Sequence, residues 1–147
     1  MKTTIRLAWH KRGAPARRAF KQESMHSLVA DYMARISRYS SPCAVAGGRP
    51  QEGANVWVCD RGRNSKRLSS EEIAGALAQQ LQSGRDLEIV IGGADGLSPE
   101  QVAELKPSLL LSFGPMTLPH ELAAVVACEQ LYRAWTIIKK TPYHLKH

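Results

Sequence analysis

The spacing of apolar and polar residues predicts that strands and helices alternate along this chain. Apolar residues at every second position, from Ile5 to Trp9, predict a first strand over residues 3–9. Apolar residues then recur every three or four positions, which predicts a helix from about residue 20 to 39 that Pro42 ends. The basic stretch between these two elements is expected to form a loop or the entry to the helix.

Further strands and helices are expected after that first helix. Ser69 with Glu72, and Ser98 with Gln101, have the spacing of capping boxes and mark two helix starts. Strands that alternate with helices predict a single α/β domain with a mostly parallel sheet and helices on both faces. The remaining predicted strands cover residues 43–46, 55–59, 87–91 and 108–113; the predicted helices cover about 70–83, a short stretch between Pro99 and Pro107, and about 119–140, with a basic loop at 60–68.

Length and composition exclude several classes of protein. The chain has 147 residues, of which 44% are hydrophobic, as is typical of one packed domain. No apolar run approaches the roughly 18 residues of a membrane span, so a membrane partner is not expected. Cys43, Cys59 and Cys128 are scattered and form no Cys-x-x-Cys pair. This pattern favours a reducing, cytoplasmic location and argues against a disulfide framework or a metal site.

The positive charge is concentrated at one end of the chain. The net charge is +7, and residues 1–40 contribute all of it, because they hold nine Lys or Arg and only two acidic residues. The other 107 residues hold eleven basic and eleven acidic residues, so their charges sum to zero. A one-sided basic segment is typical of a protein that binds a polyanion. A solvated surface and an Arg-rich targeting peptide within residues 1–22 remain as alternatives.

Glycine-rich loops follow three of the predicted strands, where open α/β sheets bind ligands. They are Asp60-Arg61-Gly62, the stretch from Gly92-Gly93 to Gly96, and Gly114-Pro115. Bare backbone allows a ligand to approach closely. A phosphate cradle fits poorly, because the lysine of a Walker loop is absent after Gly92 and Gly93. A tight turn without any ligand remains open.

The last predicted helix is apolar on nearly all sides, yet it carries Glu129 four residues before Arg133. This spacing allows an ion pair within the helix, either as a structural salt bridge or as part of a site. The tail holds Tyr143 and His144, in a position where residues are usually inert. His120, at the predicted helix start, is expected to have a capping role.

Taken together, three stretches resemble one family. GGADGLSPE, then SFGPMTLPHELAAVVACEQLYRAWTI, then PYH are similar to the RlmH-type SPOUT methyltransferases, and the likeness is weaker over residues 58–72 and 31–39. The resemblance implies one trefoil-knotted α/β domain over 1–147, with a basic first strand and helix at 1–40 and a knotted cofactor-binding region and tail at 86–147. It also implies a homodimer that uses S-adenosylmethionine, without a metal, to methylate N3 of a pseudouridine in the helix 69 loop of 23S ribosomal RNA in the assembled ribosome.

The resemblance also assigns residues to roles. His144 would accept or steer the N3 proton, Tyr143 would stack on or orient the base, and Arg133 would contact RNA or pair with Glu129; the tail would complete the site of a partner subunit. Docking on RNA would use Lys11, Arg12, Arg17, Arg18, Arg35 and Arg38. The methyl donor would be held by Cys59, Gly92, Gly93, Phe113, Gly114, Pro115, Met116, Thr117 and Leu118.

The sequence departs from the family pattern in two places. Cys59 replaces a larger aliphatic residue, and the segment LAWHKRGAPARR after the first strand is bulkier and more basic than the usual turn. Two other functions therefore stay open. One is a SPOUT methyltransferase with a different RNA target, and the other is a non-catalytic RNA-binding or ribosome-assembly protein on the same fold.

Overall fold

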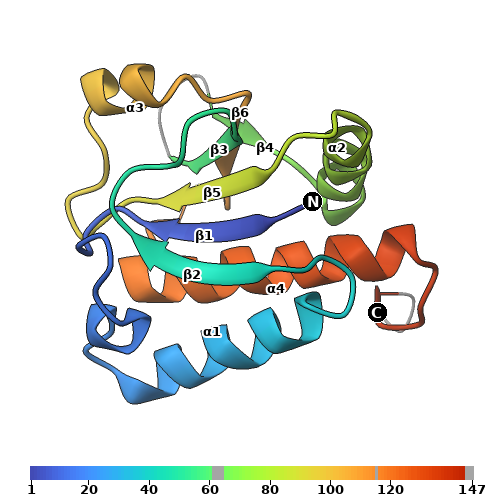
Figure 1. Cartoon of the computed structure of the whole chain (residues 1–147), viewed down its shortest axis with the longest axis horizontal. Coiled ribbons are helices and arrows are strands. Elements are labelled where there is room, and N and C mark those ends of the chain that lie inside the picture. Colours follow the sequence, from blue (N-terminus) through green and yellow to red (C-terminus); the bar gives the residue numbers. More distant parts are fainter. Residues whose placement is uncertain (61–64, 115, 145–147) are drawn as a thin grey trace.

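A six-stranded parallel sheet forms the centre of the molecule in the computed structural model, which describes residues 1–60, 65–114 and 116–144 (Figure 1). Every pairing between the described strands is parallel, in the order β2-β1-β5-β3-β6-β4. The strands are β1 (Thr3–Leu7), β2 (Cys43–Gly47), β3 (Asn55–Cys59), β4 (Lys66–Arg67), β5 (Leu87–Ile91) and β6 (Leu109–Ser112). The expected α/β class and mostly parallel sheet are confirmed.

Helices cover both faces of the sheet. One face packs against α1 (Glu23–Ile36), α2 (Ser70–Gln82) and α4 (His120–Ile138), while α3 (Pro99–Leu105) covers part of the other face (Figure 1). A short 3-10 turn at Ala16–Ala19 precedes α1. Among the described helices, none combines the length and apolar character that crossing a bilayer requires.

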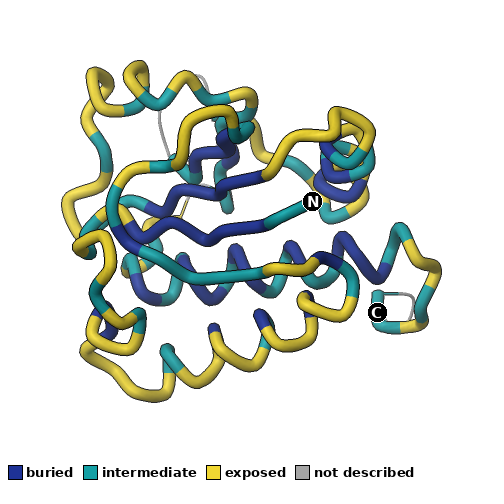
Figure 2. Tube along the Cα trace, in the orientation of Figure 1, coloured by how far each residue is buried: buried dark blue, intermediate teal, exposed yellow. Residues whose placement is uncertain are grey.

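The direction of alternate side chains explains the apolar run of β5. Ile89 and Ile91 join the main core beneath α4, whereas Val90 points to the opposite face and packs with Val58 against the α3 side. A central strand with both faces covered therefore has no exposed position. Figure 2 shows the same pattern, with buried residues along the central strands and the inner sides of α2 and α4.

Local signals in the sequence located several elements well. Both capping boxes are present: the Ser69 hydroxyl accepts from the backbone N–H of Glu72 at 3.1 Å, and Ser98 does the same for Gln101 at 3.1 Å. The first strand ends at Leu7, two residues before the predicted end, because the chain turns there and the N–H of His10 donates to the Leu7 carbonyl.

Two elements differ from the prediction. The short strand β4 lies within residues 60–68, which were expected to form only a loop. The first helix begins at Glu23 rather than near residue 20, because a separate 3-10 turn precedes it. Both differences depend on distant contacts: β4 pairs with β6, and the start of α1 receives its hydrogen-bond partner from α4.

A buried ion pair crosses from β1 to β5 on the face away from the main core. Arg6 Nε donates to Glu88 Oε1 at 2.7 Å, and both side chains are almost fully buried. Arg6 also donates to the Gly47 carbonyl at 2.8 Å, while Glu88 accepts from the backbone N–H of Gln51 at 2.9 Å. The pair thus fixes the connector between β2 and β3 against the sheet.

Candidate active site

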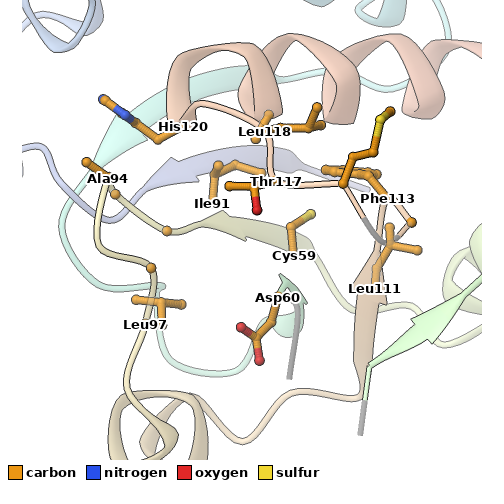
Figure 3. Close-up of a pocket in the computed structure, with 16 residues that line it drawn as sticks. Cys59, Asp60, Ile91, Ala94, Leu97, Leu111, Phe113, Thr117, Leu118 and His120 are labelled. Atoms are coloured by element: carbon orange, nitrogen blue, oxygen red, sulfur yellow. The ribbon is translucent and has the colours of Figure 1, made fainter. Parts of the chain in front are cut away.

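A pocket opens where β3, β5 and β6 end, at the carboxyl edge of the sheet (Figure 3). Its volume is about 640 Å³ with the solvent at its mouth included. Figure 3 shows Cys59 and Asp60 at the end of β3, and Thr117 on the loop between β6 and α4, among the residues that line the pocket. Arg61 and Gly62, named with Asp60 from the sequence, lie outside the described residues.

Eight of the nine residues assigned to the methyl donor line this pocket, and the ninth, Pro115, lies outside the described residues. The loop from β6 to α4 supplies most of them. Its turn is fixed by Ser112, whose hydroxyl accepts from the Gly114 N–H at 3.2 Å. Gly114 has φ +107°, a left-handed conformation that favours glycine. Met116 stands 72% exposed at the pocket's edge.

The bare backbone after β5 has a structural reason. A Cβ on Gly93 would lie 3.1 Å from Cβ of Trp9, and one on Gly92 would lie 3.3 Å from the Gly96 carbonyl carbon. The N–H of Gly96 donates back to the Gly93 carbonyl at 2.9 Å and closes the turn. Any larger residue would therefore have to displace the loop or Trp9.

The bulky segment after β1 supports this wall of the pocket. Trp9 Nε1 donates to the Ala19 carbonyl at 2.8 Å, and its ring meets the ring of His120 edge-on at 4.6 Å between centroids. His120 itself lines the pocket. The capping role expected for His120 is wrong: Pro119 occupies the N-cap position, and no side chain caps the helix there. Its position directly after the pocket loop was the signal that sequence reasoning missed.

Cys59 presents a neutral thiol to the pocket. Burial, with a smaller contribution from the charge of Asp60, raises its pKa to about 12. A thiol that stays protonated near neutral pH is a poor nucleophile and serves as apolar surface.

The four residues assigned to the acceptor side form a second group, near the end of α4. Arg133 pairs with Glu129 through Nε at 2.8 Å and Nη2 at 2.7 Å. The Tyr143 hydroxyl donates to Glu129 at 3.4 Å, and the Arg133 guanidinium lies over the Tyr143 ring, 5.0 Å from its centroid. Arg133 Nη1 lies 3.0 Å from Nδ1 of His144. The tail is thus packed onto α4 through these contacts.

The phenol of Tyr143 stays protonated in this setting. Burial raises its pKa to about 12, and the negative charge of Glu129 acts in the same direction. Tyr143 therefore acts as a hydrogen-bond donor, and its ring provides an aromatic face. The ring of Tyr132 packs edge-on against it at 4.8 Å.

The two groups are separate within one chain. None of Glu129, Arg133, Tyr143 and His144 lines the pocket. Ala123 does line it, and Glu129 lies six residues farther along α4, a rise of roughly 9 Å. One subunit therefore holds both predicted groups but does not join them into one cavity.

The comparisons with known proteins decide the family. The model of the family described as "Predicted SPOUT methyltransferase" matches residues 18–144. The chain belongs to the SPOUT methyltransferase family. A protein of Cereibacter sphaeroides named ribosomal RNA large subunit methyltransferase H is 41% identical to this SPOUT chain over an alignment of 140 positions, which covers 80% of this chain and 87% of that protein.

Other relatives agree, with different coverage. The protein of the same name from Psychrobacter arcticus is 48% identical over 99 residues, or 67% of this chain, and the match spans 56% of that protein's own length. A solved methylase family protein from Haemophilus influenzae has a TM-score of 0.55 at 10% identity and covers 97% of this chain and 69% of its own. One from Neisseria gonorrhoeae has a TM-score of 0.54 at 11% identity, with coverages of 89% and 80%. These two structures show the shared SPOUT fold.

The basic residues assigned to RNA docking are all exposed in this SPOUT chain. Arg12 donates to the Arg49 carbonyl at 2.6 Å, and Arg17 pairs loosely with Glu23 at 3.4 Å. Lys11, Arg12, Arg17 and Arg18 lie between β1 and α1, whereas Arg35 and Arg38 lie at the end of α1. Within the described residues, no group of three or more metal-ligating side chains comes together.

Proposed function

We propose that this chain is an S-adenosylmethionine-dependent methyltransferase of large-subunit ribosomal RNA. Its target is N3 of a pseudouridine in the helix 69 loop of 23S ribosomal RNA, in the assembled ribosome, and it acts as a cytoplasmic homodimer. The single observation that carries this proposal is the pocket at the strand ends, which gathers the donor-binding residues expected of the family from three separate loops.

The pocket's chemistry fits the proposed donor. Bare backbone at Gly92 and Gly93 offers N–H and C=O groups to an adenine, and Phe113 and Leu118 offer apolar contact. Among the residues that the structure describes, no lysine lines the pocket, and the lysine of a Walker loop is absent from the sequence after Gly92 and Gly93, which argues against a phosphate cradle. When bound, S-adenosylmethionine supplies an activated methyl group on its sulfonium.

The residues of the protein would hold the acceptor base and remove the proton from its N3. Tyr143 would stack on or orient the base, and Arg133 would contact the RNA backbone or keep Glu129 in place. His144 would take the proton from N3, which leaves the electron pair of that N–H bond on the nitrogen. Alignment of N3 with the methyl group then needs no metal.

Dimerisation would bring the two groups together. Because one subunit keeps its pocket and its tail apart, we propose that the tail of each subunit completes the pocket of its partner. In this arrangement residues 1–147 form one domain, and residues 86–147 form the knotted cofactor-binding region and the tail. The exposed basic residues of the first 40 positions would contact RNA phosphates.

Nucleoside mass spectrometry of 23S ribosomal RNA, from cells with and without the gene, tests the reaction. Deletion is expected to remove N3-methylpseudouridine. Wild-type protein restores it, and Gly92→Arg does not, because the arginine fills the pocket beside Leu97. Gly75→Arg is the matched control: Gly75 is exposed on α2 with open space around it, and this variant restores the mark.

Each other result points to a different function. An unchanged level of N3-methylpseudouridine contradicts the proposed target. A methyl mark lost elsewhere in RNA would then favour a SPOUT enzyme with another target. No lost mark at all, together with no binding of S-adenosylmethionine by calorimetry, would favour a non-catalytic RNA-binding or assembly protein.

A further inference from the structure

Glu71 contacts the tail from an element that the proposed site does not include. It lies in the first turn of α2, and its Oε1 is 2.8 Å from Nε2 of His144. The preceding residue reinforces this junction, since the Ser70 hydroxyl donates to the Gln130 side chain of α4 at 2.8 Å. The start of α2 is therefore fixed against the part of α4 that carries Glu129 and Arg133.

The two contacts of the His144 ring determine where its proton sits. Arg133 Nη1 lies 3.0 Å from Nδ1, and a guanidinium can only donate hydrogen bonds. Nδ1 must therefore accept, which leaves the ring hydrogen on Nε2. Nε2–H in turn donates to the carboxylate of Glu71. The pair Arg133 and Glu71 selects one tautomer of His144, with the basic nitrogen facing the Glu129–Arg133 side.

We propose that Glu71 is a positioning residue for His144 in the methyl-transfer reaction, an inference that rests on the proposed function. When an acceptor base replaces Arg133 at Nδ1, the N3–H bond breaks, its proton passes to Nδ1 and its electron pair stays on N3. The imidazole then becomes an imidazolium. Glu71 already accepts from Nε2 and stabilises this positive charge without any rearrangement.

The charges around His144 support a role for this particular carboxylate. Arg133 from α4 opposes a positive charge on the ring, and Glu129 is engaged by Arg133 and by the protonated hydroxyl of Tyr143. Among these neighbours, only Glu71 places a negatively charged carboxylate in direct contact with the His144 ring. The hydrogen bond from His144 keeps the pKa of Glu71 below its ordinary value, so Glu71 is ionised at neutral pH.

Glu71→Gln in the full-length protein tests this role, because glutamine keeps the shape and removes the charge. We expect kcat to fall by about tenfold, part of the ~10²–10⁴-fold that a positioned base contributes, with the KM for S-adenosylmethionine unchanged. The acidic limb of the pH–rate profile should move to lower pH, because a ring without its anionic partner is less basic.

Glu72→Gln is the matched control. Glu72 closes the capping box of α2 by accepting from the Ser69 N–H at 2.9 Å, and glutamine serves that function equally well. This variant should keep the wild-type kcat and pH profile.

NMR of the His144 ring nitrogens gives a readout that needs neither RNA nor activity. The wild type should show the Nε2–H tautomer, and its ring proton should move upfield in Glu71→Gln as a charged acceptor becomes neutral. The opposite tautomer, or equal kcat and pH profiles in both variants with an active wild type, overturns the role of Glu71. A wild type that transfers no methyl group to 23S ribosomal RNA overturns the proposed function and this inference with it.

Discussion

At the scale of single residues, the backbone around Gly47 leaves no room for a side chain. A Cβ at the end of β2 would lie 2.6 Å from the carbonyl carbon and oxygen of His10 and 2.6 Å from the carbonyl oxygen of Lys11. These are main-chain atoms in the turn after β1, which cannot move without disturbing the neighbouring strands. Gly75, in the exposed face of α2, has no such neighbour within 4 Å.

The same substitution should therefore have opposite effects at the two glycines. Gly47→Ala is expected to lower the free energy of unfolding by about 1–3 kcal/mol or more, because it overpacks main-chain atoms. Gly75→Ala is expected to raise it by about 0.5–1 kcal/mol, because alanine favours a helix interior. Urea denaturation of both variants checks the signs. Equal, small changes would show that the turn after β1 adjusts freely.

Residues of the site were predictable where their signal is local. The glycines after β5 and the loop after β6 stand directly behind apolar strands, so their sequence positions predicted a pocket edge. The contribution of Trp9 was not predictable, because it depends on a contact between Trp9 and Gly93 across 84 positions of chain. Glu71 was missed for the same reason, since only the fold brings it to the tail.

At the scale of elements, the start of α1 has no side-chain cap from its own residues and is held by hydrogen bonds to α4. Gln22, at the N-cap of α1, makes no side-chain capping bond. The buried carboxylate of Glu121, in the first turn of α4, accepts instead from the N–H groups of Lys21 at 3.1 Å and Gln22 at 3.2 Å. One side chain thereby satisfies two backbone donors that a distant helix start leaves open.

The Glu121→Ala variant should show how much this contact contributes to the free energy of unfolding. Loss of the carboxylate leaves both N–H groups without their partner, so the free energy of unfolding should fall by about 1–3 kcal/mol, as measured by urea denaturation. Glu23→Ala is the comparison, because the pair of Glu23 with Arg17 is highly exposed and should contribute less than about 1 kcal/mol. A loss for Glu121→Ala no larger than that for Glu23→Ala would contradict the capping role.

The contrast between α1 and the other helices explains which elements were predicted well. The starts of α2 and α3 carry capping boxes within four residues, and both were located correctly. The start of α1 is capped from about 100 positions away, and β4 exists only because β6 lies beside it. Such elements have no local signal, and periodicity alone misplaced or missed them.

At the scale of the whole molecule, the separation of pocket and tail leads to a test of the proposed homodimer. The chain has a mass of 16.2 kDa, so a dimer is readily distinguished by light scattering. If the tail of one subunit completes the pocket of its partner, two inactive variants should complement each other. The His144→Ala variant retains an intact donor pocket, and the Gly92→Arg variant retains an intact tail.

Mixed after unfolding and refolding together, these two variants should recover about a quarter of wild-type activity, since half of the dimers are mixed and each has one intact site. Methyl transfer to ribosomal RNA is the measurement, and each variant refolded alone is the control. If pocket and tail act within one subunit, every site in the mixture carries a defect and no activity returns.

The place of β5 in the sheet also has a consequence for how the chain folds during synthesis. β5 lies between β1 and β3, although it is made after both. A nascent chain that has emerged only as far as α2 can pair β1 with β2, but it has no strand to join them to β3. Until residues 87–91 leave the ribosome, both β1 and β3 present open edges that can pair with other chains. Completion of this fold therefore waits for the second half of translation, and fragments cut short before β5 should aggregate.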